Sequence, residues 1–389
     1  MEDGMTTKAL YDIDAYQTDF TAQVCACEKV TGSESNKYRV RLDATAFFPE
    51  QGGQSSDIGH IANTVVTDVQ ISDGIIWHYC DSPLEVGEKV TGRIDWEHRF
   101  NNMQQHTGEH IFTGIAHSRY GAENVGFHLS DNTVTLDLDL ELDESQIKEI
   151  ELASNQLIAR DVRVKAYYPS KEELQRTDYR SKKEIEGQVR LVEIEDTDIC
   201  ACCAPHVSST GQVGILKVIS YGKYKGGTRV YILCGLRALI DYNRRMDILS
   251  ESYRLLNCRE EELPEKITSL MEDNRQRGYE LSEIKSRMLL EKIAAYPTEL
   301  FDVTVFTEDV DSKNMRDAVN MLVEKHAGLC SVFSGDDEAG YDFVIGSKTR
   351  DCKAIAAGLR ELLGAKGGGS KEMAQGHVCA TRSAIEETL

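Results

Sequence analysis

Two pairs of potential metal ligands, about ninety residues apart, place the strongest constraint on the fold of this chain. His106 and His110 are four residues apart in a stretch, 101–120, that is predicted to be helical. Residues at i and i+4 share one helical face, so both imidazoles can reach a single ion. Cys202 and His206 repeat this spacing. If the four side chains form one site, the fold must bring the second segment against the helix.

Three imidazole nitrogens and one thiolate sulfur suit tetrahedral zinc, which accepts mixed donors of this kind. The spacing alone does not decide which thiol binds, because Cys200, Cys202 and Cys203 lie close together. Cys203 would form a pair with two intervening residues, and Cys202 is our choice. The alternative interpretation is that these cysteines are only the small residues of a turn.

The zinc protease pattern HExxH is not present at the histidine pair. Thr107 follows the first histidine, and the nearby acid, Glu109, directly precedes the second. The sequence therefore argues against a metalloprotease.

Periodicity divides the 389 residues into four parts of an α+β protein. Residues 1–94 carry short alternating apolar runs broken by Gly, Asp and Ser, which predicts a β-barrel-like module. Residues 95–239 mix helix and strand patterns and predict a two-layer α/β domain that contains the four ligands. Residues 240–295 are amphipathic and predict a helical hairpin or coiled-coil linker, and residues 296–389 predict a small C-terminal α/β domain with a glycine-rich motif.

Individual elements follow from the same patterns. In the second part we expect strands at 134–140 and 162–168 and a helix at 143–160. In the linker we expect two helices that meet near 260–264, because Pro264 is tolerated in the first turn of a helix but not in its interior. In the C-terminal part the expected strands and helices are 303–306, 341–346, 314–325 and 352–363.

The charge balance restricts the partners. Lys and Arg number 44 against 65 Asp and Glu, and the resulting net charge of −21 argues against nonspecific coating of nucleic acid or docking on an anionic membrane. No apolar run approaches the roughly 18–20 residues that a membrane span needs. The start of the chain is too polar for a signal peptide, so we expect a cytoplasmic protein whose eleven cysteines are reduced.

Three groups of residues carry a family resemblance. The chain resembles the editing domain of alanyl-tRNA synthetases and the free-standing AlaX proteins in these segments: His106-Thr107-Gly108-Glu109-His110, Cys202 to Val207, and Thr45 to Gln54 with Asp57 and Gly59. The stretch from Gly367 to Gly376 resembles the glycine-rich signature of the small C-terminal domain of the same synthetases. The resemblance covers nearly all of the chain.

The resemblance implies that residues 95–239 are a zinc-binding editing domain. Such an enzyme acts in trans and hydrolyses the ester of tRNA-Ala that is mischarged with serine or glycine. The sequence begins with the β-rich module and contains no GxxxxGK[ST] loop, so we expect neither ATP binding nor aminoacylation.

The resemblance also assigns roles around the pocket. Thr45 would hydrogen-bond the serine side chain, and because alanine lacks that hydroxyl, this contact favours the wrong amino acid as substrate. Gly52 and Gly53 would allow close approach of the backbone to the ribose or the carbonyl, with Gln54 beside them.

Three further polar residues are expected beside the zinc ligands. Glu109 would accept a hydrogen bond next to the ligands or carry a proton. His128 and Asp131 occupy positions where the family places polar groups at the pocket.

A local excess of positive charge is expected to bind RNA. Residues 160–190 hold nine Lys and Arg against six Asp and Glu. The side chains and backbone expected to contact substrate RNA are those of Lys225, Arg229, Gly368, Lys371 and Gln375. A solvated charged face is the alternative interpretation of the basic run.

Two other function classes remain open at this stage. One is a zinc-stabilised tRNA-binding or regulatory protein without turnover, and the other is a metal-dependent hydrolase of an ester outside RNA. A homodimer through the 240–295 helices or the C-terminal domain is expected from the family.

Overall fold

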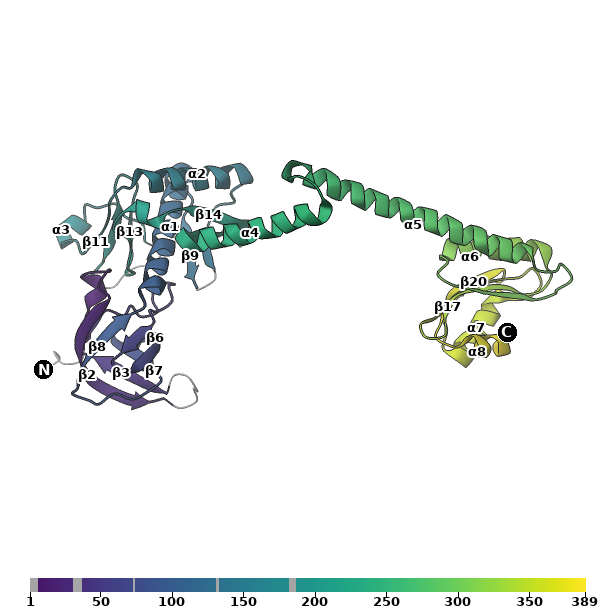
Figure 1. The fold of residues 1–389 in the computed structure, drawn as a ribbon, viewed down its shortest axis with the longest axis horizontal. Helices are drawn as coiled ribbons and strands as arrows, with labels where there is room; N and C mark the ends of the chain where they lie inside the picture. The colour runs from purple at the N-terminus through teal and green to yellow at the C-terminus, as the bar shows by residue number, and fades with distance from the viewer. Residues whose placement is uncertain (1–5, 31–36, 73, 131–132, 182–186) are drawn as a thin grey trace. The chain divides into compact units, whose positions relative to one another are not determined.

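The computed structural model describes residues 6–30, 37–72, 74–130, 133–181 and 187–389. It is a mixed α+β structure, as the sequence predicts. The chain separates into two compact units, Met1–Leu249 and Ser250–Leu389, and each is described by itself (Figure 1). Among the described residues, no helix combines the length and the apolar character needed to cross a bilayer.

The first unit begins with a closed β-barrel, drawn in purple and blue in Figure 1. Its strands, in spatial order, are β2 (Asp19–Lys29), β3 (Tyr38–Leu42), β7 (Ile75–Cys80), β6 (Thr64–Ser72), β5 (Gly59–Ile61) and β8 (Lys89–Ile94). Burial alternates along β8, where Val90 and Ile94 face the interior, because successive side chains of a strand point to opposite sides. Two short strands, β1 (Lys8–Ala9) and β4 (Ala44–Thr45), pair in parallel beside it.

A long helix, α1 (Trp96–Tyr120), follows the barrel directly. It begins at Asp95, whose carboxylate accepts the His98 N–H, and ends at Gly121 in the left-handed region, with φ of 68°. The helix therefore starts five residues before the expected position. Every side chain from Asn102 to Ala116 is buried, which makes α1 the central helix of this unit.

Two sheets pack around α1 and a second helix, α2 (Glu144–Arg160). One sheet has the order β14 (Leu216–Tyr224), β15 (Gly227–Cys234), β10 (Val134–Leu138) and β9 (Asn124–Leu129). The other consists of β11 (Val164–Tyr167), β12 (Leu191–Ile194) and β13 (Asp198–Ala201). A one-turn helix, α3 (Lys171–Leu174), lies between β11 and β12 in the sequence. The expected elements 134–140, 143–160 and 162–168 are confirmed within a few residues.

The helical stretch is divided as Pro264 predicts. The first helix, α4 (Gly235–Leu256), is followed by Asn257 in the left-handed region, and α5 (Leu263–Ala294) carries the proline in its first turn.

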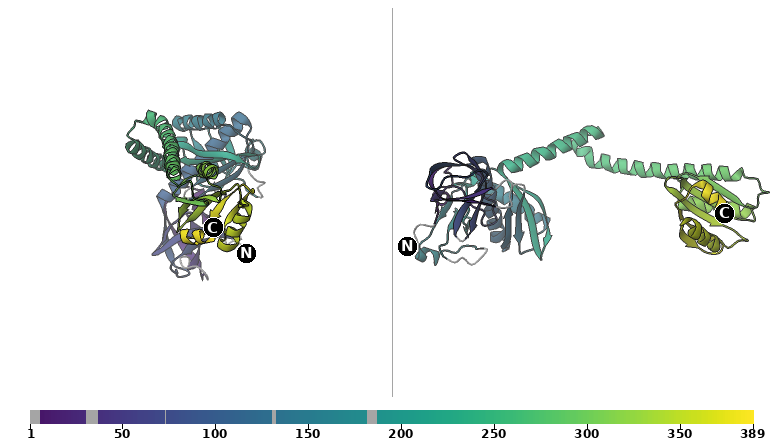
Figure 2. Two further views of the ribbon diagram at one scale, coloured as in Figure 1. Left: turned by 90° about the vertical axis from the view of Figure 1, so that its right-hand side faces the viewer. Right: turned by 90° about the horizontal axis from the view of Figure 1, so that it is seen from below.

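The second unit is a five-stranded sheet with helices on both faces (Figure 2). The strand order is β16 (Val303–Thr307), β17 (Cys330–Asp336), β18 (Gly340–Gly346), β20 (Met373–Val378) and β19 (Lys366–Gly369). One hydrophobic core lies between the sheet and the helices α5 and α6 (Ser312–Lys325). A second core lies under α7 (Cys352–Leu363) and α8 (Arg382–Thr388). The four elements expected in this region are present.

Candidate metal centre

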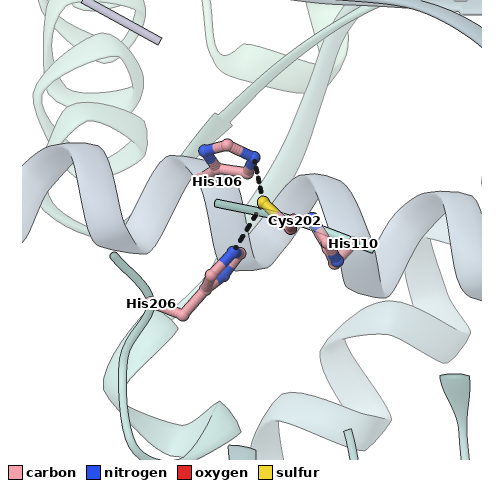
Figure 3. A group of neighbouring side chains, drawn as sticks. All are labelled: His106, His110, Cys202 and His206. Atoms are coloured by element: carbon pink, nitrogen blue, oxygen red, sulfur yellow. Dashed lines mark hydrogen bonds between the residues drawn. The ribbon is translucent and has the colours of Figure 1, made fainter. Parts of the chain in front are cut away.

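The two predicted ligand pairs meet in the first unit (Figure 3). His106 and His110 project from one face of α1, while Cys202 and His206 belong to the segment that follows β13. One potential ligand atom from each residue lies within 4.8 Å of the others. Cys202 Sγ is 3.5 Å from His106 Nε2 and 3.3 Å from His206 Nε2. The fold therefore satisfies the constraint set by the sequence.

These distances fit a tetrahedral zinc ion. With usual zinc–nitrogen and zinc–sulfur bond lengths, the sulfur–nitrogen edge of the tetrahedron measures about 3.6 Å. The three histidines are buried, whereas Cys202 is partly exposed. A ligand from solvent would thus approach on the side of Cys202.

Hydrogen bonds on the far side of two rings fix their orientation. The Nδ1 atom of His106 lies 2.7 Å from Gln54 Oε1, and Nδ1 of His206 lies 3.0 Å from Thr107 Oγ1. Each contact leaves Nε2 directed at Cys202 Sγ. Partners of this kind hold the ring and select the tautomer of a metal-binding histidine, so the site is organised beyond its four ligands.

A glycine turn delivers Gln54 to the site. Gly52 and Gly53 have φ of 64° and 85°, in the left-handed region. A Cβ at Gly53 would lie only 2.6 Å from the carbonyl oxygen of Phe127, so a side chain there would push the turn away from β9. The Leu129 N–H donates to the Gly53 carbonyl over 2.7 Å. The two glycines thus hold the turn against β9 and place Gln54 at His106.

Glu109 lies against the histidines and is buried. Its Oε2 is 3.5 Å from His110 Nε2 and 4.0 Å from His106 Nε2. Its Oε1 accepts hydrogen bonds from Asn124 Nδ2 and from the Thr113 hydroxyl. Of the two roles that the sequence leaves open, an acceptor beside the ligands agrees best with this geometry.

Arg190 holds the turn that carries Cys202, and no sequence pattern pointed to this residue. Its guanidinium donates to the carbonyls of Cys202 and Ala204 over 3.0 and 2.9 Å. The Cys202 N–H in turn donates to the Arg190 carbonyl over 3.0 Å. No local pattern marks an arginine whose partners are backbone carbonyls twelve or more residues away.

The other two candidate thiols have different surroundings. Cys203 would lie 3.4 Å from a Cβ at Gly52, and burial raises the pKa of its thiol. Cys200 is buried on β13 and forms a second potential metal group with His110 and Asp198. Asp198 also accepts a bidentate pair of hydrogen bonds from Arg180. Of the three thiols, only that of Cys202 belongs to the potential metal group that contains His106, His110 and His206.

Thr45 is completely buried on β4, beside the barrel. Its hydroxyl lies 2.8 Å from His78 Nε2 and accepts the Phe47 N–H. Burial lowers the pKa of His78 to about 4, and Nδ1 lies 3.0 Å from the Val40 carbonyl. The neutral ring therefore carries its proton on Nδ1, so Nε2 accepts the Thr45 proton. Contact of Thr45 with a substrate stays a prediction, and the structure directs its only donor to His78.

The remaining predicted residues of the first unit lie outside the four-ligand group. His128 is exposed on β9, and Asp131 falls outside the described residues. Lys225 follows β14 in the left-handed region and lies over the Tyr224 ring. Arg229 donates to both carboxylate oxygens of Asp137, which raises the pKa of the guanidinium. The guanidinium group that was expected to contact RNA is thus already bound to Asp137.

The predicted RNA contacts of the C-terminal part lie in the second unit. Gly368 is exposed on the edge strand β19. Gln375 lies opposite it on β20, and its side-chain oxygen accepts a hydrogen bond from Arg316 over 2.7 Å. Lys371 is exposed in the loop between these strands.

Comparison with known proteins agrees with these observations. Residues 5–98 match the family of class II (A) tRNA synthetases, and residues 189–231 match the threonyl and alanyl tRNA synthetase second additional domain. The chain is 29% identical to the alanyl-tRNA editing protein AlaX-L of Pyrococcus horikoshii, over 95% of this chain and 94% of that protein. The resemblance to the AlaX-type editing proteins is confirmed.

Two further similarities complete the comparison. The alanine–tRNA ligase of Pyrococcus abyssi is 28% identical over 98% of this chain, and the match spans 43% of that ligase. Among solved structures, the C-Ala domain of Aquifex aeolicus alanyl-tRNA synthetase matches 22% of this chain and 85% of that chain, with 23% identity and a TM-score of 0.20.

Proposed function

We propose that this AlaX-type chain is an aminoacyl-tRNA deacylase that acts in trans. Its substrates are Ser-tRNA-Ala, Gly-tRNA-Ala or both, and it uses zinc and performs no aminoacylation. The similarity to proteins named alanyl-tRNA editing proteins supports the editing role. The four-ligand group supports the metal dependence.

One observation carries the proposal: four side chains from two distant segments converge, and hydrogen bonds at Nδ1 fix the orientation of two of the histidine rings. Gln54 and Thr107 orient His106 and His206 before any ligand arrives. Zinc held by the four ligands would act as a Lewis acid on the ester carbonyl or would anchor the substrate.

The chain's own groups prepare the rest of the site. The buried carboxyl group of Glu109 lies beside His106 and His110, where it would partly balance the charge of a zinc ion held by the four ligands. The Gly52–Gly53 turn keeps the backbone close to β9 and leaves no Cβ in the narrow space at Phe127. Catalysis of ester hydrolysis depends on such fixed groups, because they need no reorganisation during the reaction.

Recognition of tRNA-Ala is proposed to involve residues of both units. Lys225 is the candidate cation near β14, and Gly368, Lys371 and Gln375 are the candidates in the second unit. Arg229 can bind a phosphate only if its guanidinium gives up its hydrogen bonds to Asp137. A cytoplasmic homodimer through the 240–295 helices or the C-terminal domain completes the proposal.

The decisive experiment is deacylation of Ser-tRNA-Ala, Gly-tRNA-Ala and Ala-tRNA-Ala by the zinc-loaded protein. We expect loss of the seryl or glycyl ester while the alanyl ester is spared. The His106→Ala variant should lose zinc and hydrolysis together. His117→Ala is the matched control, because His117 lies on the same helix, is partly exposed and pairs with Glu123. Binding of zinc and tRNA without turnover would instead indicate a tRNA-binding or regulatory protein.

A further inference from the structure

The second unit contains a cysteine, a histidine and an aspartate in line, away from the proposed metal centre. Cys379 Sγ lies 3.4 Å from His377 Nε2, and His377 Nδ1 lies 2.9 Å from Asp342 Oδ1. A thiol, a base and a carboxylate that orients the base form the arrangement by which proteins activate a nucleophile. The editing function proposed above does not use these residues.

The sheet itself builds this arrangement. His377 on β20 and Asp342 on β18 are directly opposite each other in the antiparallel register, so their side chains share one face. Cys379 follows the last residue of β20 and is two residues beyond His377. A Cβ at Gly340 would lie 3.0 Å from Cys379 Cα and 3.1 Å from His377 Nε2. Glycine at position 340 therefore leaves the space that the Cys379 backbone and the His377 ring occupy.

Accessibility distinguishes Cys379 from the other thiols. All eleven cysteines fall within the described residues, and Cys379 is the one classed as exposed. The side chains of His377 and Asp342 are 42% and 61% exposed. A small reagent can therefore reach the sulfur without any opening of the fold.

The surrounding charge indicates which reagents can react. His377 lines an open pocket of about 790 Å³, whereas Cys379 is not one of its lining residues. Its charged lining residues, apart from His377, are Glu308, Asp309, Asp311, Asp336, Asp342 and Lys285. Lys285 is paired with Asp309, so the pocket is strongly negative. An anionic reagent that approaches the His377 side of the Cys379–His377 pair through this pocket is therefore repelled, whereas an uncharged reagent is not.

We propose that Cys379 is a nucleophilic thiol that reacts with small uncharged hydroperoxides. The thiol proton moves to His377 Nε2 while the sulfur attacks one peroxide oxygen. The S–O bond forms, the O–O bond breaks, and the proton passes to the departing oxygen. The thiol is oxidised to a sulfenic acid and the hydroperoxide is reduced to an alcohol, or to water when hydrogen peroxide reacts.

Asp342 acts as a positioning residue in this step. Its carboxylate oxygen lies 2.9 Å from Nδ1 and orients the ring so that Nε2 faces the Cys379 thiol. It also stabilises the imidazolium while the sulfur attacks. Replacement by asparagine keeps the shape of this side chain and removes its charge.

The test uses the full-length zinc-loaded protein. Hydrogen peroxide is added below stoichiometry, sulfenic acid is trapped with dimedone, and peptide mapping gives the rate at each cysteine. Cys25 is the internal comparator, since its thiol donates to the Gln23 carbonyl rather than to a base. We expect Cys379 to react at least about tenfold faster than Cys25. We also expect His377→Asn and Asp342→Asn to reduce this ratio without changing the thermal unfolding temperature.

Two further comparisons make the test decisive. Cys379→Ser must remove the fast label, and wild-type Cys379 should prefer iodoacetamide over the anionic iodoacetate more strongly than Cys25 does. Equal peroxide rates at Cys379 and Cys25, or an unchanged Cys379 rate in His377→Asn, would overturn the proposal. An equal preference between the two alkylating reagents would overturn the restriction to uncharged electrophiles.

Discussion

Gln54 links the glycine turn to the proposed metal centre through a single side chain. It is completely buried, and its oxygen lies 2.7 Å from Nδ1 of His106. Loss of such a partner typically weakens metal affinity 10–100-fold, because the ligand ring is no longer held. We therefore expect Gln54→Ala to bind zinc roughly 10–100-fold more weakly in a chelator competition assay.

The neighbouring residue Gln51 provides the control. It belongs to the same turn but is exposed. Gln51→Ala should keep the zinc affinity of the wild type. Equal affinities in the wild type and in Gln54→Ala would show that the hydrogen bond does not organise the site.

His78 makes the stability of the fold depend on pH. Burial lowers its pKa from 6.5 to about 4 in the folded chain. Below pH 6.5, His78 therefore binds a proton in the unfolded chain but not in the folded chain. The free energy of unfolding decreases as the pH falls toward 4. The full difference corresponds to about 3 kcal/mol, and the loss is absent above the unfolded pKa.

The measurement is urea unfolding from pH 7 to pH 4 for the wild type and for His78→Asn. Carboxylates also titrate in this range, so the difference between the two proteins isolates the histidine. We expect the wild type to lose about 3 kcal/mol more than the variant over this interval. Parallel pH profiles would mean that His78 titrates normally in the folded protein.

At the scale of elements, Gly108 fixes the approach of α1 to β15. A Cβ at this position would lie 2.2 Å from Cys234 Sγ. The residue stands between the two histidines of α1, so a shift of the helix here moves both ligands. We expect Gly108→Ala to destabilise the protein by about 1–3 kcal/mol in urea unfolding and to weaken zinc binding.

A double variant separates this contact from helix propensity. Cys234→Ala removes the sulfur that the new methyl group meets, so the Gly108→Ala, Cys234→Ala protein should lose less stability than the two single variants added together. If the losses of stability in the two single variants add up to that of the double variant, the strain caused by Gly108→Ala does not arise from contact with Cys234.

Local patterns predicted the elements that have a clear period or a strong boundary residue. Pro264 marked the break in the helical stretch, and the ranges 143–160 and 352–363 agree with α2 and α7. The start of α1 was placed too late, because the boundary depends on the Asp95 cap rather than on apolar spacing. Spacing also pointed to the two ligand pairs, since i and i+4 positions carry information about a shared face, although it did not decide between Cys202 and Cys203.

Contacts between distant residues could not be predicted in this way. The approach of Gln54 to RNA or substrate stays a prediction, whereas its hydrogen bond to His106, fifty-two residues away, was not anticipated. The bond between Thr45 and His78 spans thirty-three residues and joins β4, which lies outside the barrel, to the barrel strand β7. Such pairs depend on the closed topology, which no local period encodes.

At the scale of the whole molecule, internal pairing reduces the positive charge available for RNA. Lys217, Lys223 and Arg229 are paired with Glu151, Glu141 and Asp137, respectively. Each carboxylate lies more than sixty residues from its partner, so counting charges along the sequence does not reveal the pairing. With a net charge of −21, the proposed recognition of tRNA is expected to depend on shape more than on an excess of cations.

The division into two compact units predicts that the proposed metal centre is independent of the C-terminal part. All four ligands, together with Gln54 and Thr107, belong to Met1–Leu249. A fragment of residues 1–257 would keep the whole of α4, which ends at Leu256. We expect this fragment to bind one equivalent of zinc with the affinity of the full chain, measured by chelator competition. His106→Ala in the same fragment is the control and should abolish binding. A folded fragment with weaker zinc binding, or one that fails to fold, would mean that residues beyond 257 stabilise the centre.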